Sequence, residues 1–410
     1  MKKGLVQIGL WIMCAFAANA EIRVDAQIPA GNIVCERIEG DQIYLHQELR
    51  SSTQWWFYWA FRVCGAEGRT LTFHFTNGEP VSTRGPAVSE DLGLTWRWLN
   101  KEFTKNSFTY TFGPQEAEVR FAFGWVYTQR DWERFIARFD GSPFVERLPL
   151  AVTRKGRKAE KLRLGCLRSE PRCRVLLTAR HHCCEMTASY AMEGIIEAVL
   201  ADSEGAKWLR DNVEFLAIPL VDADGVEDGD QGKYRAPRDH NRDYDGASVH
   251  VETAAIREQV PKWAGTKLAV ALDLHCPTIS GEHNERVYQV GSTDTNVWAQ
   301  QQAFGKLLEA LKPNPLGYRQ ANDLPYGKAW NTSANFSQGM SFGRWASTLP
   351  DVRIAGSIEI PYATASGAEV NAQSARQFGD NLATALAQYL RGAGKKGKDD
   401  AYVVPASAGP

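Results

Sequence analysis

The sequence lacks an excess of charge of either sign. Its 410 residues include 47 lysines and arginines against 48 aspartates and glutamates, which gives a formal net charge of −1. Proteins that bind nucleic acid through its phosphates concentrate basic residues, and this chain has no such surplus. Composition therefore gives no support for nucleic acid as a partner. The sequence also has no internal repeat and no sustained heptad pattern, so a monomer is the default expectation.

Long apolar runs are missing after residue 20, so no stable membrane association is expected. The first twenty residues have the features of a signal peptide. Lys2 and Lys3 precede an apolar run over about residues 4–17, and Ala18-Asn19-Ala20 offers a cleavage site of small residues. This run is shorter than the ~20 residues of a spanning helix. The sequence predicts a secreted or periplasmic protein that is cleaved after Ala20.

Cysteine is scarce, with eight residues, and Cys14 lies in the predicted signal peptide. Export would place the other seven in an oxidising compartment, where at least one stays unpaired in a monomer. Cys35 with Cys64 and Cys166 with Cys173 are plausible pairs. Spacing does not determine connectivity, so the disulfide pattern stays open.

Aromatic residues are abundant in the first third of the chain. Hydrophobic residues make up 44% of the sequence, and the length suggests two or three domains. Between Gln42 and about Phe139, short aromatic and β-branched runs such as Trp55–Phe61 alternate with polar positions and turns, which predicts an antiparallel β-sandwich. The aromatics could instead form a carbohydrate-binding surface, but packing between sheets is the favoured interpretation.

After about residue 140, apolar strands alternate with amphipathic helices, as in an α/β domain with a largely parallel or mixed sheet. The expected organisation is a signal peptide (1–20), a β-sandwich domain (21–139), a catalytic domain (140–391) and a disordered tail (392–410). The candidate strands are 174–179, 213–221, 268–274 and 354–361, and the candidate helices are 191–201, 296–311 and 372–390.

Ionisable residues gather where three of these strands end, which is where open α/β sheets place their sites. His182 and Glu185 follow the first strand, His275 ends the third, and Glu359 lies near the end of the fourth. Two histidines and one carboxylate form the ligand set of a catalytic zinc site with a position left for water. His-x-x-Glu alone is weak evidence, but its place after a buried strand strengthens it.

Neighbouring residues offer competing ligands. Cys183 and Cys184 could bind zinc as thiolates, but adjacent cysteines rarely reach one tetrahedral ion, so we interpret them as loop or disulfide residues. His181 is the rival of His182. Its spacing to Glu185 is less favourable, and we expect it to be packed or to face solvent.

A long loop at residues 222–243 carries three arginines, and such loops in compact domains are commonly functional. Asn241 and Arg242 could hold the terminal carboxylate of a substrate, while Arg235 could polarise the scissile carbonyl. The alternative is a solvated surface loop with internal Asp–Arg pairs. The neighbouring metal candidates favour the functional interpretation.

The ordered set resembles the M14 zinc carboxypeptidases. It consists of His-x-x-Glu, Asp-Gly-Val followed by Arg and Asp-x-Asn-Arg, Asp-Leu-His, and a late strand with Glu. The cytosolic carboxypeptidase-like branch, which has an N-terminal β domain, is the more specific match over nearly the whole chain. This resemblance implies a mixed, largely parallel eight-stranded sheet between helices and one Zn²⁺ per chain.

The resemblance also implies residue roles. His182, Glu185 and His275 resemble the zinc ligands, and Glu359 resembles the general base. Arg235 resembles the arginine that stabilises the oxyanion, and Asn241 with Arg242 resembles the pair that grips the C-terminal carboxylate. Asp239 matches the acid that hydrogen-bonds a zinc-bound histidine. The implied activity is the removal of C-terminal residues from peptides with a free carboxylate.

Two features depart from the family pattern. Cys183-Cys184 replaces the Pro-Gly that is usual in cytosolic relatives, and the substrate-capping tyrosine has no clear counterpart among residues 326–345. Arg344 lies in the region that shapes the side-chain pocket in relatives. It suggests a preference for acidic C-terminal residues, although a surface arginine is an equally good interpretation.

Two other functions compete with the carboxypeptidase. A zinc amidase acting on peptidoglycan stem peptides or N-acyl amino acids would use the same chemistry, and export is compatible with a cell-wall substrate. A non-catalytic binding module on the same fold would be expected to lack a ligand, the base or an arginine. This sequence retains the complete set.

Overall fold

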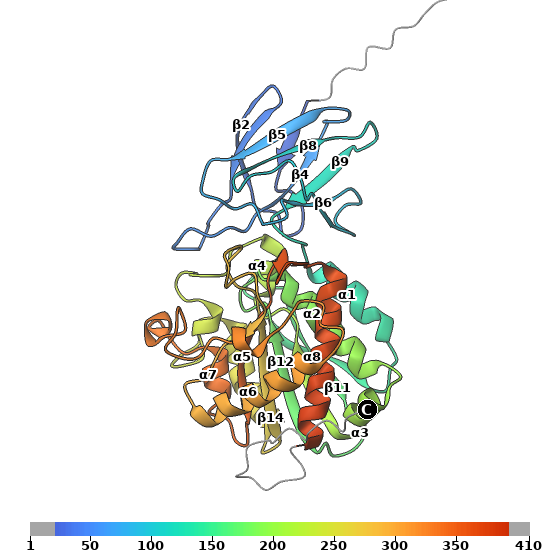
Figure 1. Ribbon diagram of the computed structural model, residues 1–410. Coiled ribbons are helices and arrows are strands. Elements are labelled where there is room, and N and C mark those ends of the chain that lie inside the picture. The colour runs from blue at the N-terminus through green and yellow to red at the C-terminus, as the bar shows by residue number, and fades with distance from the viewer. Residues whose placement is uncertain (1–20, 393–410) are drawn as a thin grey trace, which may run out of the picture.

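The computed structural model describes residues 21–392, and the predicted signal peptide and the tail from residue 393 lie outside the described residues. Figure 1 shows two small sheets at one end of the molecule and a larger sheet enclosed by helices at the other. No described helix is long and apolar enough to cross a membrane. The α/β architecture with a mixed sheet and a preceding β region is the predicted one.

The N-terminal region forms two sheets. Strands of the five-stranded sheet are, in spatial order, β1 (Arg23–Asp25), β4 (Ala60–Cys64), β9 (Glu118–Ala122), β6 (Ala87–Ser89) and β7 (Arg97–Trp98). The four-stranded sheet has the order β2 (Val34–Glu39), β3 (Gln42–His46), β5 (Thr70–Phe75) and β8 (Ser107–Thr111). The antiparallel expectation is wrong for one pair, because β3 and β5 run parallel.

Aromatic side chains from both sheets contact one another. The rings of Phe61 and Phe73 are centred 5.6 Å apart, and those of Phe108 and Phe121 are 5.3 Å apart. Phe61 and Phe121 belong to one sheet, Phe73 and Phe108 to the other, and all four are buried. The aromatic richness of this region therefore reflects packing, since offset ring pairs supply large buried areas.

The β region ends earlier than the sequence suggested. Residues up to Phe139 were expected to belong to it, but α1 (Gln129–Ile136) and a 3-10 turn (Ala137–Phe139) occupy its last segment. Thr128 and Asp131 form a capping box at the start of α1. This pattern of a hydroxyl followed three residues later by an acid is a local signal for a helix N-terminus.

The larger sheet has the order β10 (Val145–Val152), β11 (Lys158–Gly165), β13 (Val213–Ile218), β12 (Cys173–Ala179), β14 (Leu268–His275), β16 (Ile354–Glu359) and β15 (Tyr288–Gln289). The four strands from β13 to β16 in this order are parallel, and the outer pairings are antiparallel. Within residues 21–392 the sheet has seven strands, so the expected eight is wrong. A short hairpin, β17 (Thr364–Ala365) and β18 (Ala368–Glu369), stands apart.

Helices cover both faces of this sheet (Figure 1). One core contains side chains of α2 (Met186–Leu200), α3 (Glu204–Asn212), α6 (Thr295–Ala310) and α8 (Ala372–Gly392), and the other contains side chains of α5 (Val251–Ala264) and α7 (Phe342–Ala346). Short elements lie in the connecting loops: α4 (Ala223–Asp228) and 3-10 turns at His240–Arg242, Gln320–Asn322 and Ser333–Phe336. Every residue of β14 is buried, which explains its nearly continuous apolar sequence.

The two disulfides suggested from spacing do not form. All seven described cysteines are free, including Cys35, Cys64, Cys166 and Cys173.

Gly194 of α2 and Gly379 of α8 allow these helices to approach closely. A Cβ atom at Gly194 would lie 1.9 Å from the carbonyl oxygen of Arg376, and one at Gly379 would lie 2.1 Å from that of Ala191. We expect Gly194→Ala to lower the free energy of unfolding by about 1–3 kcal/mol through overpacking. A thermal melt measures this, with Gly205→Ala as control, because its added Cβ would meet only Ser203 Oγ at 3.9 Å. Equal melting temperatures for the two variants would contradict the prediction.

Candidate metal centre

The carboxyl ends of three adjacent parallel strands bring the predicted ligands together. In the register of the sheet Ala179 of β12 pairs with Leu274 of β14, and His275 of β14 pairs with Glu359 of β16. His182 and Glu185 lie in the turn that follows β12. The side chains that the sequence placed at separate strand ends therefore share one edge of the sheet.

Arg180 holds the turn that carries His182 and Glu185. Its backbone is left-handed, with φ of 64°, and its side chain is buried. Its Nε donates to the Cys183 carbonyl at 3.0 Å, and Nη1 donates to the Tyr127 carbonyl and to Ser189 Oγ, both at 3.0 Å. A buried guanidinium with these acceptors fixes the turn, a role that the sequence pattern did not indicate.

The carboxylate of Glu185 lies between the two histidines. Its Oε1 is 3.0 Å from His182 Nδ1, and its Oε2 is 2.7 Å from His275 Nδ1. One ligand atom from each residue lies within 4.8 Å of the others, and all three residues are buried. Burial alone would raise the pKa of Glu185, but Lys233 and the two histidines hold that pKa well below its usual range. Such a set fits a divalent metal ion of the zinc type.

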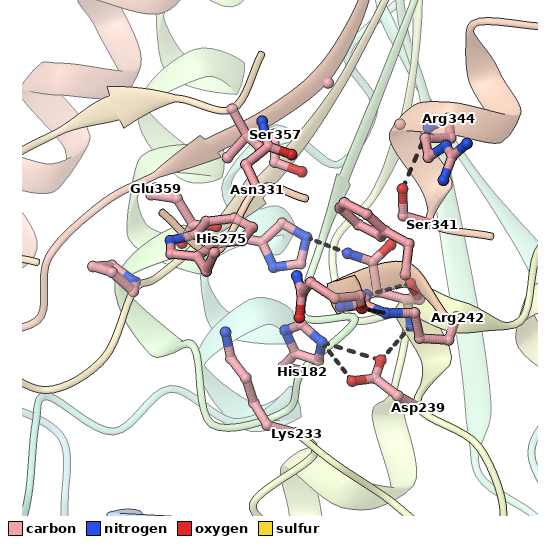
Figure 2. Close-up of a pocket in the computed structure, with 18 of the residues that line it drawn as sticks. His182, Lys233, Asp239, Arg242, His275, Asn331, Ser341, Arg344, Ser357 and Glu359 are labelled. Atoms are coloured by element: carbon pink, nitrogen blue, oxygen red, sulfur yellow. Dashed lines mark hydrogen bonds and ion pairs between the residues drawn. The ribbon is translucent and has the colours of Figure 1, made fainter. Parts of the chain in front are cut away.

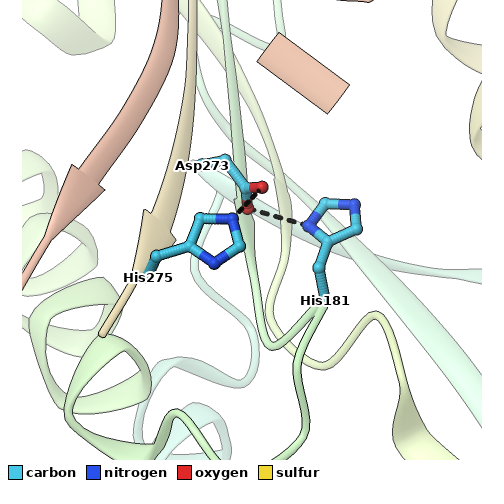
Figure 3. A group of neighbouring side chains, drawn as sticks. All are labelled: His181, Asp273 and His275. Carbon is cyan, nitrogen blue, oxygen red and sulfur yellow. Dashed lines mark hydrogen bonds and ion pairs between the residues drawn. The ribbon is translucent and has the colours of Figure 1, made fainter. Parts of the chain in front are cut away.

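Acidic side chains are hydrogen-bonded to the Nε2 atoms of both histidine rings. His182 Nε2 is 3.1 Å from both carboxylate oxygens of Asp239, and His275 Nε2 is 2.5 Å from Asp273 Oδ2 (Figures 2 and 3). When each Nε2 carries the proton and donates it to an acid, the Nδ1 lone pair is left for a metal. The ring orientation therefore fits metal binding through Nδ1.

Asp273 also joins His181 to this network, as Figure 3 shows. Its Oδ1 is 2.8 Å from His181 Nδ1 and accepts from Thr178 Oγ1 at 2.8 Å. His181 is completely buried, and its Nε2 is 2.7 Å from the Tyr244 hydroxyl. His181 is therefore packed and does not face solvent. The sequence prediction gave Asp273 no role. Residues two apart on a strand share a face, so its spacing to His275 could have indicated that the two side chains meet.

A second group of His240, His250 and Glu252 is also close enough to consider as a metal site. The two rings stack with centroids 3.5 Å apart and an angle of 16° between planes. Nearly parallel stacked rings direct their in-plane lone pairs side by side, so they converge poorly on one ion. His250 Nε2 is also 2.8 Å from the Arg238 carbonyl. The geometry thus favours the group around Glu185.

Glu359 lies in a pocket of about 410 Å³ that His182 and His275 also line (Figure 2). Its side chain is buried, and its Oε2 has no hydrogen-bond partner within the described residues. Burial raises the pKa of Glu359, and the nearby Lys233 ammonium opposes that rise. An unpartnered carboxylate oxygen in a pocket is suited to accept a proton or a hydrogen bond from a ligand.

Asn241 and Arg242 both line this pocket. Asn241 Oδ1 accepts from the Phe342 backbone N–H at 2.8 Å, which settles which end of the amide is oxygen. Its Nδ2 lies 3.1 Å from His275 Nε2. When His275 Nε2 carries a proton and donates it to Asp273, it cannot accept from Asn241, and the N–H groups of Asn241 remain for a ligand. Arg242 donates to the carbonyls of Asn335 and Asn241 at 3.0 and 2.7 Å.

Arg344 is exposed at the wall of the same pocket, on α7. Its guanidinium carbon lies 5.6 Å from the centre of the Phe336 ring, and that of Arg242 lies 5.0 Å from the same centre. Tyr326 and Trp330 form other parts of the wall. The pocket therefore has two arginines near one aromatic ring.

Arg235 does not line the pocket. Its Nη2 is 2.6 Å from Asp222 Oδ2 and 3.2 Å from Asp230 Oδ2. Lys233, two residues earlier, does line it, and its Nζ is 2.6 Å from Glu185 Oε1. Arg235 was the expected cation at this position, and Lys233 was given no role in the sequence prediction.

Cys183 and Cys184 are buried beside the centre without belonging to a described metal group. Cys183 Sγ donates to the Asp230 carbonyl at 3.1 Å, and Cys184 Sγ lies 3.8 Å from the Tyr362 hydroxyl. They are loop residues, as expected, but neither is in a disulfide.

The fold resembles that of solved metallo-carboxypeptidases. A metallo-carboxypeptidase from Burkholderia cenocepacia superposes with a TM-score of 0.73 at 18% identity, covering 90% of this chain and 99% of that one. At this identity the match establishes the fold. It is the α/β fold with a mixed sheet and a preceding β region.

Sequence comparisons give the family resemblance. Residues 24–123 match the cytosolic carboxypeptidase N-terminal domain. An uncharacterised protein of Zymomonas mobilis is 27% identical over 215 residues, which cover 50% of this chain and 54% of that protein. Cytosolic carboxypeptidase 3 of Bos taurus is 24% identical over 231 residues, which cover 52% and 22% respectively. The aligned region thus spans about half or less of these relatives.

The resemblance to the M14 zinc carboxypeptidases, and within them to the cytosolic carboxypeptidase-like branch, is confirmed.

Proposed function

We propose that this chain is a zinc metallocarboxypeptidase that removes C-terminal residues from peptides. One observation carries the proposal. His182, Glu185 and His275 converge through two Nδ1 atoms and a carboxylate, and the unpartnered Oε2 of Glu359 is buried in the pocket that both histidines line. This arrangement combines a metal ligand set with a group that can accept a proton.

His182, Glu185 and His275 would hold one Zn²⁺, which when bound supplies a Lewis acid for a water molecule and a carbonyl group. Asp239 and Asp273 keep the outer nitrogens of the two rings protonated, so that both Nδ1 atoms are free to act as ligands. The donor set is that of hydrolytic zinc sites and differs from the all-oxygen sets that calcium and magnesium prefer.

Glu359 acts as the general base. Its carboxylate takes a proton from water, the oxygen of that water attacks the last peptide carbonyl carbon, and the carbon–nitrogen bond then breaks. Glu359 returns the proton to the leaving amine, so the carboxylate is regenerated. Burial raises the pKa of Glu359, which suits this role because it makes the carboxylate a stronger base toward water.

Asn241 and Arg242 hold the free carboxylate of the peptide. Their place in the pocket supports this role, since a guanidinium and an amide can donate to both carboxylate oxygens. Holding the terminus fixes which peptide bond reaches Glu359. A peptide that lacks a free C-terminal carboxylate should therefore bind poorly.

Secretion to the periplasm or the medium is part of the proposal. It rests on the two lysines, the apolar run and Ala18-Asn19-Ala20 at the start of the sequence. Edman sequencing of the mature protein from the culture or periplasm should begin at Glu21.

The proposed activity is tested by metal analysis and a peptide panel on the same preparation. We expect one zinc per chain and loss of single residues from the C-terminus, with no reaction on matching C-terminal amides. Cleavage of peptidoglycan stem peptides or N-acyl amino acids in preference to the panel would indicate the amidase instead. Zinc without turnover on either set, or no zinc, would contradict the proposal and favour a binding module.

Arg344 is the candidate for side-chain recognition. We expect wild-type kcat/KM to be higher for a peptide ending in Glu than for those ending in Lys or Phe. Arg344→Ala should reduce this ratio by up to about 5-fold, because an ion pair with an exposed arginine is worth roughly 0.2–1 kcal/mol. Measuring kcat/KM for the three peptides decides this, with Arg319→Ala as a control outside the pocket lining. An unchanged ratio would remove Arg344 from the proposal.

A further inference from the structure

Two cations of the loop after α4 have opposite surroundings. Lys233 enters the pocket, where Figure 2 shows its side chain pointing toward His275 and Glu359. Its Nζ also lies 5.3 Å from the centre of the Trp56 ring, which comes from the N-terminal β region. Arg235 instead binds Asp222 and Asp230 away from the pocket. A positive charge therefore reaches the centre from Lys233.

The backbone conformation explains why Lys233 and Arg235 face different surroundings. The loop pairs with residues 51–53 of the N-terminal region, because Thr53 N–H donates to the Tyr234 carbonyl and Ala236 N–H to the Ser51 carbonyl, both at 2.9 Å. Side chains two apart on a regular strand share a face. Tyr234 has a φ of 50°, a left-handed conformation that breaks this alternation. Lys233 and Arg235 can therefore face different surroundings.

Lys233 retains donor capacity for a ligand. An ammonium group has three donors. Two have partners: Glu185 Oε1 at 2.6 Å and the Cys276 carbonyl at 3.3 Å. Arg235, in contrast, is held by two carboxylates, those of Asp222 and Asp230.

We propose that Lys233, and not Arg235, donates a hydrogen bond to the oxygen of the scissile carbonyl. This inference rests on the proposed peptidase function. The ammonium lies against a proposed metal ligand and in the pocket of Glu359, so it can contact an oxygen that gains negative charge when water attacks. A donor positioned for that charge stabilises the transition state more than the bound substrate.

The test compares Lys233→Met and Lys233→Arg with the wild type. Zinc content, kcat, KM and the Kd of a peptide phosphonate that mimics the tetrahedral state are measured for each. For Lys233→Met we expect one zinc per chain, an unchanged melting temperature and KM, and a kcat lowered about 10²–10³-fold, the usual cost of one oxyanion donor. The phosphonate Kd should rise by a similar factor. Lys233→Arg should restore part of both losses.

Two further variants separate the alternatives. Lys262→Met removes a surface lysine of α5 whose side chain is 71% exposed, and it should change none of these quantities. Arg235→Met should lower the melting temperature, because it removes the guanidinium from the buried carboxylate of Asp222, whereas Asp230 still pairs with Arg50. The proposal is overturned if Arg235→Met raises the phosphonate Kd while Lys233→Met does not, or if kcat of Lys233→Met falls less than 10-fold.

Loss of zinc from Lys233→Met would also overturn the proposal, since Lys233 would then be a positioning residue for Glu185. A wild-type protein that cleaves no peptide would refute the peptidase function alone. The phosphonate Kd would still test whether Lys233 contacts the oxyanion, because this measurement requires no turnover. A wild type that neither cleaves peptides nor binds the phosphonate refutes both.

Discussion

Glu359→Gln should keep one zinc per chain and lose turnover by a factor of at least ~100, the low end for a positioned acid–base group. The glutamine has nearly the same volume and replaces a buried side chain that does not belong to the ligand group. It can accept a hydrogen bond from water, but it does not take up the proton. The effect should therefore appear in kcat, with little change in KM or in the melting temperature.

The measurement is kcat on the best peptide of the panel, together with zinc content on the same sample. Glu258→Gln on α5 is the matched control, because that side chain is 68% exposed and pairs with Lys262 on the surface. A Glu359→Gln variant with near-normal kcat would eliminate Glu359 as the general base. A variant without zinc would instead assign Glu359 to metal binding.

Asp273→Asn should weaken zinc binding by about 10–100-fold, the usual cost of losing a partner of a metal-bound histidine. Asp273 accepts from His275 Nε2 through one oxygen and from His181 Nδ1 through the other. An asparagine offers an N–H group to one of these rings. If the His275 ring responds by moving its proton to Nδ1, the lone pair needed for the metal is lost.

Competition with a chromogenic chelator measures the zinc Kd of this variant. Asp211→Asn on α3 is the control, since its side chain is 55% exposed and pairs with Lys207. Excess zinc should restore turnover to Asp273→Asn but not to Glu359→Gln. Unchanged zinc affinity in Asp273→Asn would mean that His275 holds its tautomer without the aspartate.

Much of the architecture could be predicted because it is encoded locally. The strand expected at 268–274 is found at Leu268–His275, and the helix expected at 296–311 is found at Thr295–Ala310. Buried parallel strands have continuous apolar sequences, and helices repeat their apolar positions every three or four residues. The helix expected at 191–201 starts earlier, at Met186. Its first turn is buried on all sides and lacks that periodicity, so the sequence pattern did not indicate it.

Features that depend on pairing between distant segments were predicted less well. Three features depend on which segments meet in space: the parallel pairing of β3 with β5, the number of strands in the larger sheet, which is seven and not eight, and the free cysteines. Strand alternation is the same for parallel and antiparallel neighbours when one face is buried. Cysteine spacing likewise carries no information on the distance between two sulfur atoms.

The sequence by itself indicated the candidate ligands and the candidate base, because strand ends in a parallel sheet meet at one edge whatever the loops do. It placed His182, Glu185, His275 and Glu359 on such ends. Only the tertiary structure decided which cation accompanies them. The sequence pattern favoured Arg235, but Tyr234, a left-handed residue held against the N-terminal region, separates it from Lys233. Lys233 lines the pocket, and Arg235 does not.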